Sequence, residues 1–458
     1  MSITGPGSIN AANLAAQTNL FNQLNKLSLQ LGTGEASQTY AGLGPQAGVA
    51  LSLSSQLAAL NGYSTTATSV GTTLTLAQSV LTQLGDASTA VQQSVNKQDA
   101  FTLNNSGQTS TQQSAASYLD QILSLLNTQA GDNYMFSGEA VNTPSVASSS
   151  AILNGSGSQA GLTQVMAERL QADQGASGLG RLVIPAASGS TVSINEDAAG
   201  SPFGFKLGSV SSSLTGATVT GPSGSPASIS VALGSNPNAG DNITFNLTLP
   251  DGSSQAITLQ ATTASPPGAN QFTIVTTTAA TASNLQTALS GAVSNLDQTA
   301  LPAASAIAAA NNFFSSDPPQ RVNGPPFNTA TSLVNGTSAN TVFWYTGENS
   351  ATPARQTATA QVGPDITIAY GMRANEPAIS TLVANVAVLA AATCKQPERP
   401  DQLSGAVPKG DRQSQRPAWH AANHRYRGEP CQCADRERQR NHIEYANPEH
   451  LAGHAARN

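Results

Sequence analysis

The sequence predicts an α+β fold in which both terminal regions form a long, coiled-coil-like helical rod, with a β-rich insertion domain in the middle. Apolar residues recur at alternating steps of three and four in the first 130 residues, which is the coiled-coil period. Period-two alternation follows, and a helical pattern returns near residue 377. We therefore expect four segments: an N-terminal helical region (1–144), a β-rich outer insertion domain (145–300), a return segment with the start of a C-terminal helix (301–392), and an aberrant tail (393–458).

The first helix is predicted by four leucines at 4-3-4 spacing, which form one apolar stripe: Leu20, Leu24, Leu27 and Leu31. Gly32 and Gly34 are expected to end this helix, because glycine is common just past a helix C-terminus. The segment TYAGLGP (39–45) then reads as a turn-rich connection.

A second, longer helix is predicted from a stripe that starts with Leu53, Leu57, Leu60, Ser64 and Ala67. A three-residue step, which resembles a coiled-coil stammer, leads to a second run with 4-3 alternation: Val70, Leu74, Ala77, Leu81, Leu84, Ser88, Val91 and Val95. A third helix carries Ala115, Leu119, Ile122 and Leu126. These stripes could equally be the core of an ordinary helical bundle.

The β-rich region is predicted most clearly by two alternating runs on either side of Pro250-Asp251-Gly252, which read as a hairpin. These runs are Ile243, Phe245, Leu247 and Leu249, and then Ile257, Leu259 and Ala261. Further strands are expected at 229–233, 272–275, 342–345 and 366–370. A helix is expected around 285–296, and Pro377 is expected to open another with Ile379, Val383 and Val386 on one face.

Composition argues against an enzyme. Only 10% of the residues are charged, and residues 1–393 contain no Cys and no His. That part of the chain therefore cannot supply a Ser-His-Asp, Cys-His or H-E-x-x-H site. Acidic residues such as Asp241, Asp251 and Asp365 are scattered and read as turn residues. We expect no catalytic, cofactor-binding or metal-binding residues, and the net charge of -6 gives no reason to expect nucleic acid.

Several segments resemble the bacterial flagellin and flagellar hook-associated protein 3 family over about residues 1–392. LSLQLGTGEASQTYAG (27–42) and GVALSLSSQLAALNGY (48–63) resemble the end of its first helix and the helix that follows. GDNYMFSGEAVNTP (131–144) resembles a motif of hook-associated members. Three further segments resemble flagellins of alphaproteobacterial type: FFSSDPPQRVNGPPFNTATSLV (313–334), VFWYTGE (342–348) and ITIAYGMRANE (366–376).

The resemblance implies a secreted structural protein that self-assembles for motility. Its partners would be copies of itself in a helical filament, other flagellar axial proteins, the flagellar export apparatus and an export chaperone. It would be extracellular and reach the flagellum by the type III export route without a cleaved signal peptide, and it would not insert into a membrane. Leu20, Leu24, Leu27 and Leu31 would form the polymerisation interface. The core of the helical rod would contain Leu53, Leu57, Leu60, Leu74, Leu81, Leu84, Leu119, Ile122 and Leu126.

The tail after Thr393 departs from this pattern. It holds all three Cys, all five His and 11 of the 19 Lys and Arg residues, and four prolines among its first 24 residues exclude the family's long helix. The spacing of Cys431-x-Cys433 is poor for a zinc site. A reading frame shifted by one base permits ASNPNAPTSYQALSQRVT over 394–411, DIEASLANAQTA over 425–436 and MLQG over 454–457. These strings resemble the family's C-terminal helix, so we interpret 393–458 as a frameshifted and disordered tail.

Two alternatives remain open. The YMFSG segment favours a hook–filament junction protein, whereas the 313–376 stretch and the large β insertion favour a filament flagellin. A secreted adhesin would share the Ser/Thr/Gly-rich β segment, but it would not need heptad helices at both ends.

Overall fold

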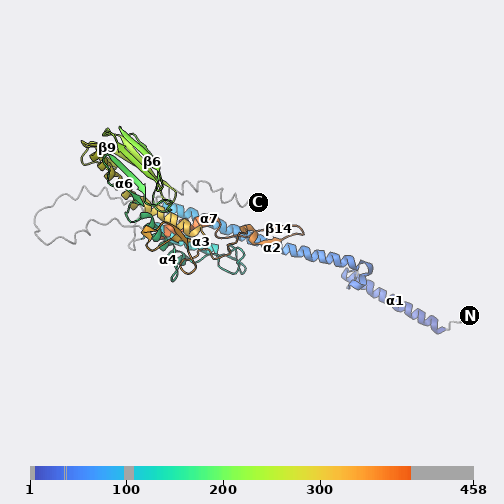
Figure 1. The fold of residues 1–458 in the computed structure, drawn as a ribbon. Coiled ribbons are helices and arrows are strands. Elements are labelled where there is room, and N and C mark those ends of the chain that lie inside the picture. The colour runs from blue at the N-terminus through green and yellow to red at the C-terminus, as the bar shows by residue number, and fades with distance from the viewer. Residues whose placement is uncertain (1–5, 36, 38, 97–107, 393–458) are drawn as a thin grey trace, which may run out of the picture. The chain divides into compact units, whose positions relative to one another are not determined.

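The computed structural model describes residues 6–35, 37, 39–96 and 108–392, and it contains both helices and sheets (Figure 1). The predicted α+β class is therefore confirmed. The chain divides into two compact units. The first unit comprises the described residues up to Leu74 together with Thr359–Tyr370, and the second comprises Thr75–Ala358 and the described residues from Gly371 onward. The tail, whose frameshift we predicted, lies outside the described residues.

The first unit contains helix α1 (Pro6–Thr33), the 3-10 helix η1 (Tyr40–Gln46) and the start of α2 (Ala47–Val95). It also contains a short antiparallel hairpin, β13 (Thr359–Gln361) and β14 (Thr367–Ala369). Helix α1 ends at Thr33, directly before Gly34, as the sequence predicted. Gly34 has a positive φ of 70°, and its amide donates to the Gln30 carbonyl at 2.9 Å.

The helical core of the second unit joins the end of α2 to α3 (Ser110–Leu126), α5 (Leu162–Gln174) and α7 (Pro377–Ala391). Thr109 caps α3 in a reciprocal capping box with Gln112. Pro377 occupies the first turn of α7, where its missing N–H is no loss, and the predicted Ile379, Val383 and Val386 are buried. In Figure 1, α3 and α7 lie together beside the lower end of α6.

A second core lies in the same unit between two four-stranded sheets and α6 (Thr278–Phe314). The first sheet has the order β3-β4-β7-β6 and is antiparallel, with β3 (Leu182–Val183), β4 (Thr191–Glu196), β7 (Ser228–Leu233) and β6 (Ala217–Ser223). The second has the order β10-β9-β8-β5, with β10 (Gln271–Thr273), β9 (Ser254–Thr262), β8 (Asn242–Thr248) and β5 (Lys206–Ser212). Only β10 and β9 of this sheet are parallel. Shorter elements are β1 (Gln129–Ala130), β2 (Asn133–Tyr134), β11 (Gln320–Val322), η2 (Phe327–Thr329), β12 (Leu333–Asn335) and η3 (Ala354–Thr357).

The hairpin predicted around Pro250-Asp251-Gly252 is confirmed, because β8 and β9 pair in register from Asn242↔Gln260 to Thr248↔Ser254. Gly252 has a φ of 83°, which suits glycine, and Asp251 accepts hydrogen bonds from the amide and hydroxyl of Ser253. The side chains that alternate along both strands point into the second core.

Helix α6 is longer than the sequence pattern predicted, and it contributes to both cores. Leu285, Leu289 and Val293 are buried against the sheets, whereas Phe313 and Phe314 belong to the helical core. It continues through Pro302, although proline in a helix interior costs about 3 kcal/mol. Burial of the alanine-rich turns that follow offsets this cost.

Two segments differ from their expected structure. Residues 149–174, placed with the β-rich region by sequence, form helices α4 (Ser149–Asn154) and α5, and Ile152 and Leu162 pack in the helical core. The predicted strand at 342–345 is wrong. The backbone groups of this segment form hydrogen bonds with two different parts of the chain. Val342 N donates to Ala160 O, and Ala147 N donates to Trp344 O, so no continuous ladder forms.

Candidate functional site

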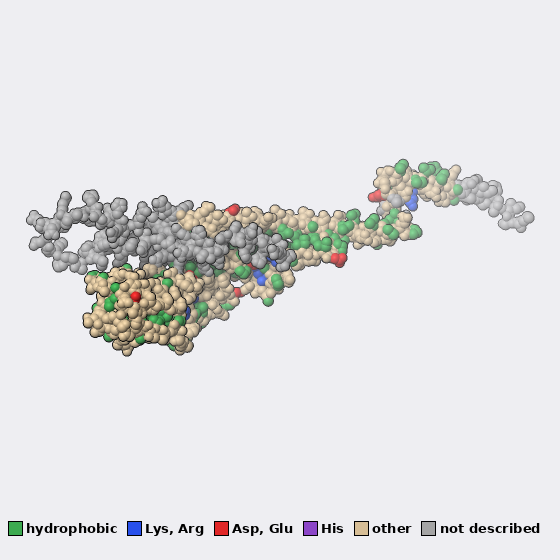
Figure 2. Space-filling model, turned by 90° about the horizontal axis from the view of Figure 1, so that it is seen from above, with side chains coloured by type: hydrophobic (Ala, Val, Ile, Leu, Met, Phe, Trp, Pro, Cys, Tyr) green, Lys and Arg blue, Asp and Glu red, His purple; other side chains and the backbone are tan. Residues whose placement is uncertain are grey.

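The predicted polymerisation interface is solvent-exposed in the chain. Leu20, Leu24, Leu27 and Leu31 on α1 expose 60, 57, 63 and 89% of their surface. Figure 2 shows hydrophobic side chains on the surface of the segment that carries α1 and the start of α2, where charged side chains are sparse. Within the first unit, these leucines therefore offer an uncovered apolar surface, which in a soluble chain marks an interaction site or an aggregation hazard.

The predicted residues of the helical rod core fall into two groups. Leu84, Leu119, Ile122 and Leu126 are buried together in the helical core. The others are exposed within the single chain: Leu53, Leu57, Leu60, Leu74 and Leu81.

The buried seam of α2 matches the predicted one only in part. The predicted residues that are buried are Val70, Ala77, Leu84, Val91 and Val95. Between them, Val80 and Ala87 are buried instead of Leu81 and Ser88, and Ser94 is buried beside Val95. The buried spacing is therefore 3-4, whereas the predicted spacing was 4-3. Small residues such as Ala87 and Ser94 allow helices to approach closely, so the structure buries them and leaves Leu81 at the surface.

A junction of three sequence motifs lies beside the helical core, and sequence reasoning did not identify it as a site. The motifs are 134–139 (YMFSGE), 343–348 (FWYTGE) and the end of 366–376 (MRANE). Backbone hydrogen bonds join all three, because Glu348 N donates to Ser137 O, Gly138 N to Met372 O, and Ala374 N to Phe136 O. The repeated pattern of aromatic, Ser/Thr, Gly and Glu in the first two motifs was the available signal.

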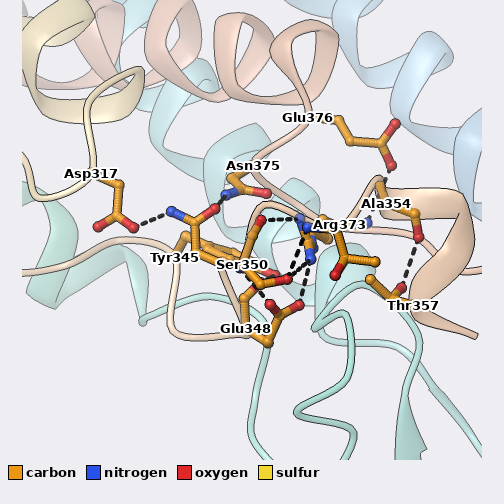
Figure 3. Close-up of polar contacts among 11 residues, drawn as sticks. Asp317, Tyr345, Glu348, Ser350, Ala354, Thr357, Arg373, Asn375 and Glu376 are labelled. Carbon is orange, nitrogen blue, oxygen red and sulfur yellow. Dashed lines mark hydrogen bonds and ion pairs between the residues drawn. The ribbon is translucent and has the colours of Figure 1, made fainter.

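An ion pair between Arg373 and Glu348 lies at the centre of this junction (Figure 3). Arg373 Nη2 lies 2.5 Å from Glu348 Oε2 and 3.1 Å from Ser350 Oγ, and its side chain is buried. Burial acts to raise the pKa of Glu348, but hydrogen bonds from Ser350 and Arg373 together with the Arg373 charge hold it below its ordinary value. Arg355 pairs with Glu376 at 2.8 Å just before α7. These ion pairs fix the start of α7 against residues 348–355, while the backbone bonds of Gly138 and Ala374 join it to residues 136–138.

Replacing Gly138 by Ala is expected to disrupt this ion pair. Gly138 has a φ of 67°, and an added Cβ would lie 2.9 Å from Glu348 Oε2 and 3.1 Å from Arg373 Nε. We expect the free energy of unfolding to fall by about 2–3 kcal/mol in urea denaturation. Gly131→Ala is the matched control, because its φ of 65° is similar but its added Cβ meets nothing within 4 Å. An equal loss in both variants would show that backbone strain alone acts.

A cavity of about 240 Å³ opens beside the junction, at the start of α7. Its lining includes Trp344, Tyr345 and Asn375. The polar groups bond to one another: Trp344 Nε1 donates to Phe314 O at 3.0 Å, Tyr345 OH to Glu348 O at 2.8 Å, and Asn375 Nδ2 to Asn349 Oδ1 at 2.9 Å. Burial raises the pKa of Tyr345, so its phenol is neutral at physiological pH. These three polar side chains therefore have hydrogen-bond partners within the protein.

A second polar cluster links α5 and α6 to the loops that enter the sheets. The Asp173 carboxylate accepts from Arg169 Nε at 2.8 Å, from Ser305 Oγ at 2.7 Å and from Gly204 N at 2.9 Å. Asp297 accepts from Gly180 N at 2.9 Å. Burial raises the pKa of both carboxyl groups, although their hydrogen bonds act in the opposite direction. This cluster connects the helical core to the β-rich core.

The variant Asp297→Asn is expected to gain stability relative to the parent chain as the pH rises from 4 to 7. Because the pKa of Asp297 is raised on folding, the folded state holds this proton more tightly than the unfolded state. The protonated Asp297 carboxyl therefore stabilises the folded parent chain at acidic pH, and this stabilisation is lost as the carboxyl ionises. Denaturation of both proteins across this range measures the difference, and a pH-independent difference would contradict the assignment.

Neither a metal-binding group nor a membrane-spanning helix is found in the described parts of the chain. Comparison with protein-family models, with curated proteins and with solved structures gave no significant match.

Proposed function

We propose that this chain is a structural subunit of the bacterial flagellum, which polymerises through its terminal helices into the filament for motility. The observation that carries this proposal is the leucine-rich surface of α1 and the start of α2, in which Lys26 is the single charged residue of α1. Residues 47–85 contain no charged residue, yet Leu53, Leu57 and Leu60 are exposed. Burying such an apolar surface between subunits is more favourable than leaving it exposed to solvent.

In this proposal the helices at both ends form a coiled-coil-like rod, and the two-sheet region faces outward as an insertion. The long α2, the separate second core and the return of the chain to α7 beside α3 support this arrangement. The protein would be exported by the flagellar type III route. Its partners would be further copies, other axial proteins, the export apparatus and an export chaperone, and it would act without a cofactor.

A second candidate is the hook–filament junction protein of the same family. The observation in its favour is the YMFSGE motif, which resembles hook-associated members and forms part of the motif junction through Phe136, Ser137 and Gly138. A junction subunit would join two different axial polymers and would not grow into a long filament of its own.

The tail affects whether this copy assembles. If residues 394–458 replace the family's C-terminal helix, α1 has lost the helix that would pair with it in the family. We therefore expect the chain as it stands to assemble poorly, and we expect a gene with one base removed at codon 394 to encode an assembling product.

Deletion of residues 1–35 tests the proposal against a secreted adhesin. We expect the deletion to abolish both secretion and assembly in a flagellated host, because it removes the export segment and the α1 stripe. Secreted protein and filaments are measured in the parent and the deletion strain, each carrying the one-base-deleted gene. A deleted chain that is still secreted as a soluble binding protein would contradict the flagellar role.

A further inference from the structure

Helix α2 carries two heptad stripes. The buried stripe contains Ala77, Val80, Leu84, Ala87, Val91 and Ser94. The second stripe keeps 4-3 spacing without interruption and contains Leu53, Leu57, Leu60, Ser64, Ala67, Gly71, Leu74, Gln78 and Leu81. The three-residue step predicted as a stammer is the passage from one stripe to the other, and α2 itself continues unbroken from Ala47 to Val95.

The two stripes face different directions. At 3.5 residues per turn, their centres lie about 100° apart around the helix axis. The second stripe is therefore a separate face, not the edge of the buried core. Its leucines in the first unit are exposed, with 65% for Leu53, 59% for Leu57 and 58% for Leu60. Leu51, also exposed at 58%, lies on the opposite side of the helix.

The chemistry of the second stripe limits what can cover it. No charged residue occurs between 47 and 85, so a charged partner would lose hydration without gaining an opposite charge. The fitting partner is an uncharged helix with leucines at the same spacing. Helix α1 has this character, because Leu20, Leu24, Leu27 and Leu31 repeat the 4-3-4 spacing of the second stripe and Lys26 is its single charged residue.

The α1 stripe does not cover the second stripe within one chain, since both sets of leucines are exposed. We propose that the α1 stripe of one copy packs on the second stripe of α2 of another copy. The α1 stripe spans about 16 Å, which fits on the roughly 21 Å between Leu53 and Ala67. The contact joins two different surfaces, so it is heterologous and can extend into an open polymer. It rests on the proposed function and specifies which surfaces meet.

Disulfide crosslinking between two variants tests this pairing. Both chains come from the gene with one base removed at codon 394, because the chain as it stands is expected to assemble poorly. The restored segments over 394–411 and 425–436 contain no Cys where the present chain has Cys394, Cys431 and Cys433, and any other Cys is replaced by Ser. A chain with Leu27→Cys is mixed with a chain with Leu57→Cys under mild oxidation, and the crosslinked peptides are quantified by mass spectrometry. Leu29→Cys and Leu51→Cys are matched controls, because both are exposed leucines on the opposite faces of α1 and α2.

We expect the mixed Leu27→Cys/Leu57→Cys crosslink to exceed both control pairings and both homodimers by at least tenfold. Dominant homodimers would overturn the pairing, as would mixed crosslinks no more abundant than those of the controls. A double variant, Leu27→Cys with Leu57→Cys, that closes within one chain on dilution would also overturn it. Sedimentation of the one-base-deleted product separates the two proposals. Polymer without the mixed crosslink contradicts only this pairing, whereas the absence of both contradicts the proposed function as well.

Discussion

Replacing Asp173 by Ala is expected to lower the free energy of unfolding of the second unit by about 3–5 kcal/mol. The substitution leaves Arg169 buried without its counter-charge and removes the acceptor for Ser305 Oγ and Gly204 N. Because these contacts join the helical core to the β-rich core, both should lose stability together. Urea denaturation followed by circular dichroism measures the loss.

Two further variants sharpen this test. Asp120→Ala on exposed α3 surface should change stability by no more than about 0.5 kcal/mol. The double variant Arg169→Met with Asp173→Leu should recover much of the loss, because removing both charges leaves no buried ion unpaired. A loss below about 1 kcal/mol in Asp173→Ala would mean that the buried ion pair does not hold the two cores together.

Replacing Leu27 by Glu is expected to abolish polymerisation of the one-base-deleted product. A carboxylate buried in an apolar helix contact would cost several kcal/mol, so the concentration needed for assembly should rise by at least about 100-fold. The thermal transition of the β-rich core should be unchanged, since its buried residues come from strands β3–β10 and α6. Pelleting by ultracentrifugation and circular dichroism measure the two properties.

Leu29→Glu is the control for this experiment. Leu29 is an exposed leucine of the same helix, 51% exposed, but it lies opposite the stripe of Leu20, Leu24, Leu27 and Leu31. It should leave assembly within about threefold of the parent product. Equal loss in both variants would show that any charge on α1 blocks assembly, and the stripe would then have no special role.

Local patterns in the sequence were sufficient to predict α1, α2, α3 and α7, the end of α1 beside Gly34, the start of α7 at Pro377 and the main hairpin. Gly34, Pro377 and the turn at Pro250-Asp251-Gly252 act through their own backbone preferences, which are visible without a tertiary structure. The same holds for the alternation along β8 and β9, whose period of two belongs to the strand itself.

Features that depend on contacts distant in sequence were not predicted correctly. The α2 pattern allows 3-4 and 4-3 stripes alike, and only packing in the helical core selects Val80 and Ala87 over Leu81. Likewise, nothing local to the motifs at 134–139 and 343–348 shows that Ser137 O accepts from Glu348 N. The tertiary structure decides which α2 stripe is buried and which segments pair, because the local sequence is compatible with more than one arrangement.

Sedimentation combined with electron microscopy of two gene products tests the central claim most directly. One product is the chain as it stands, and the other comes from the gene with one base removed at codon 394. We predict that the second product pellets as helical filaments above a critical concentration, whereas most of the first stays in the supernatant. A one-base-deleted product that remains monomeric at all concentrations would contradict the proposed role of α1 and α2 in polymerisation.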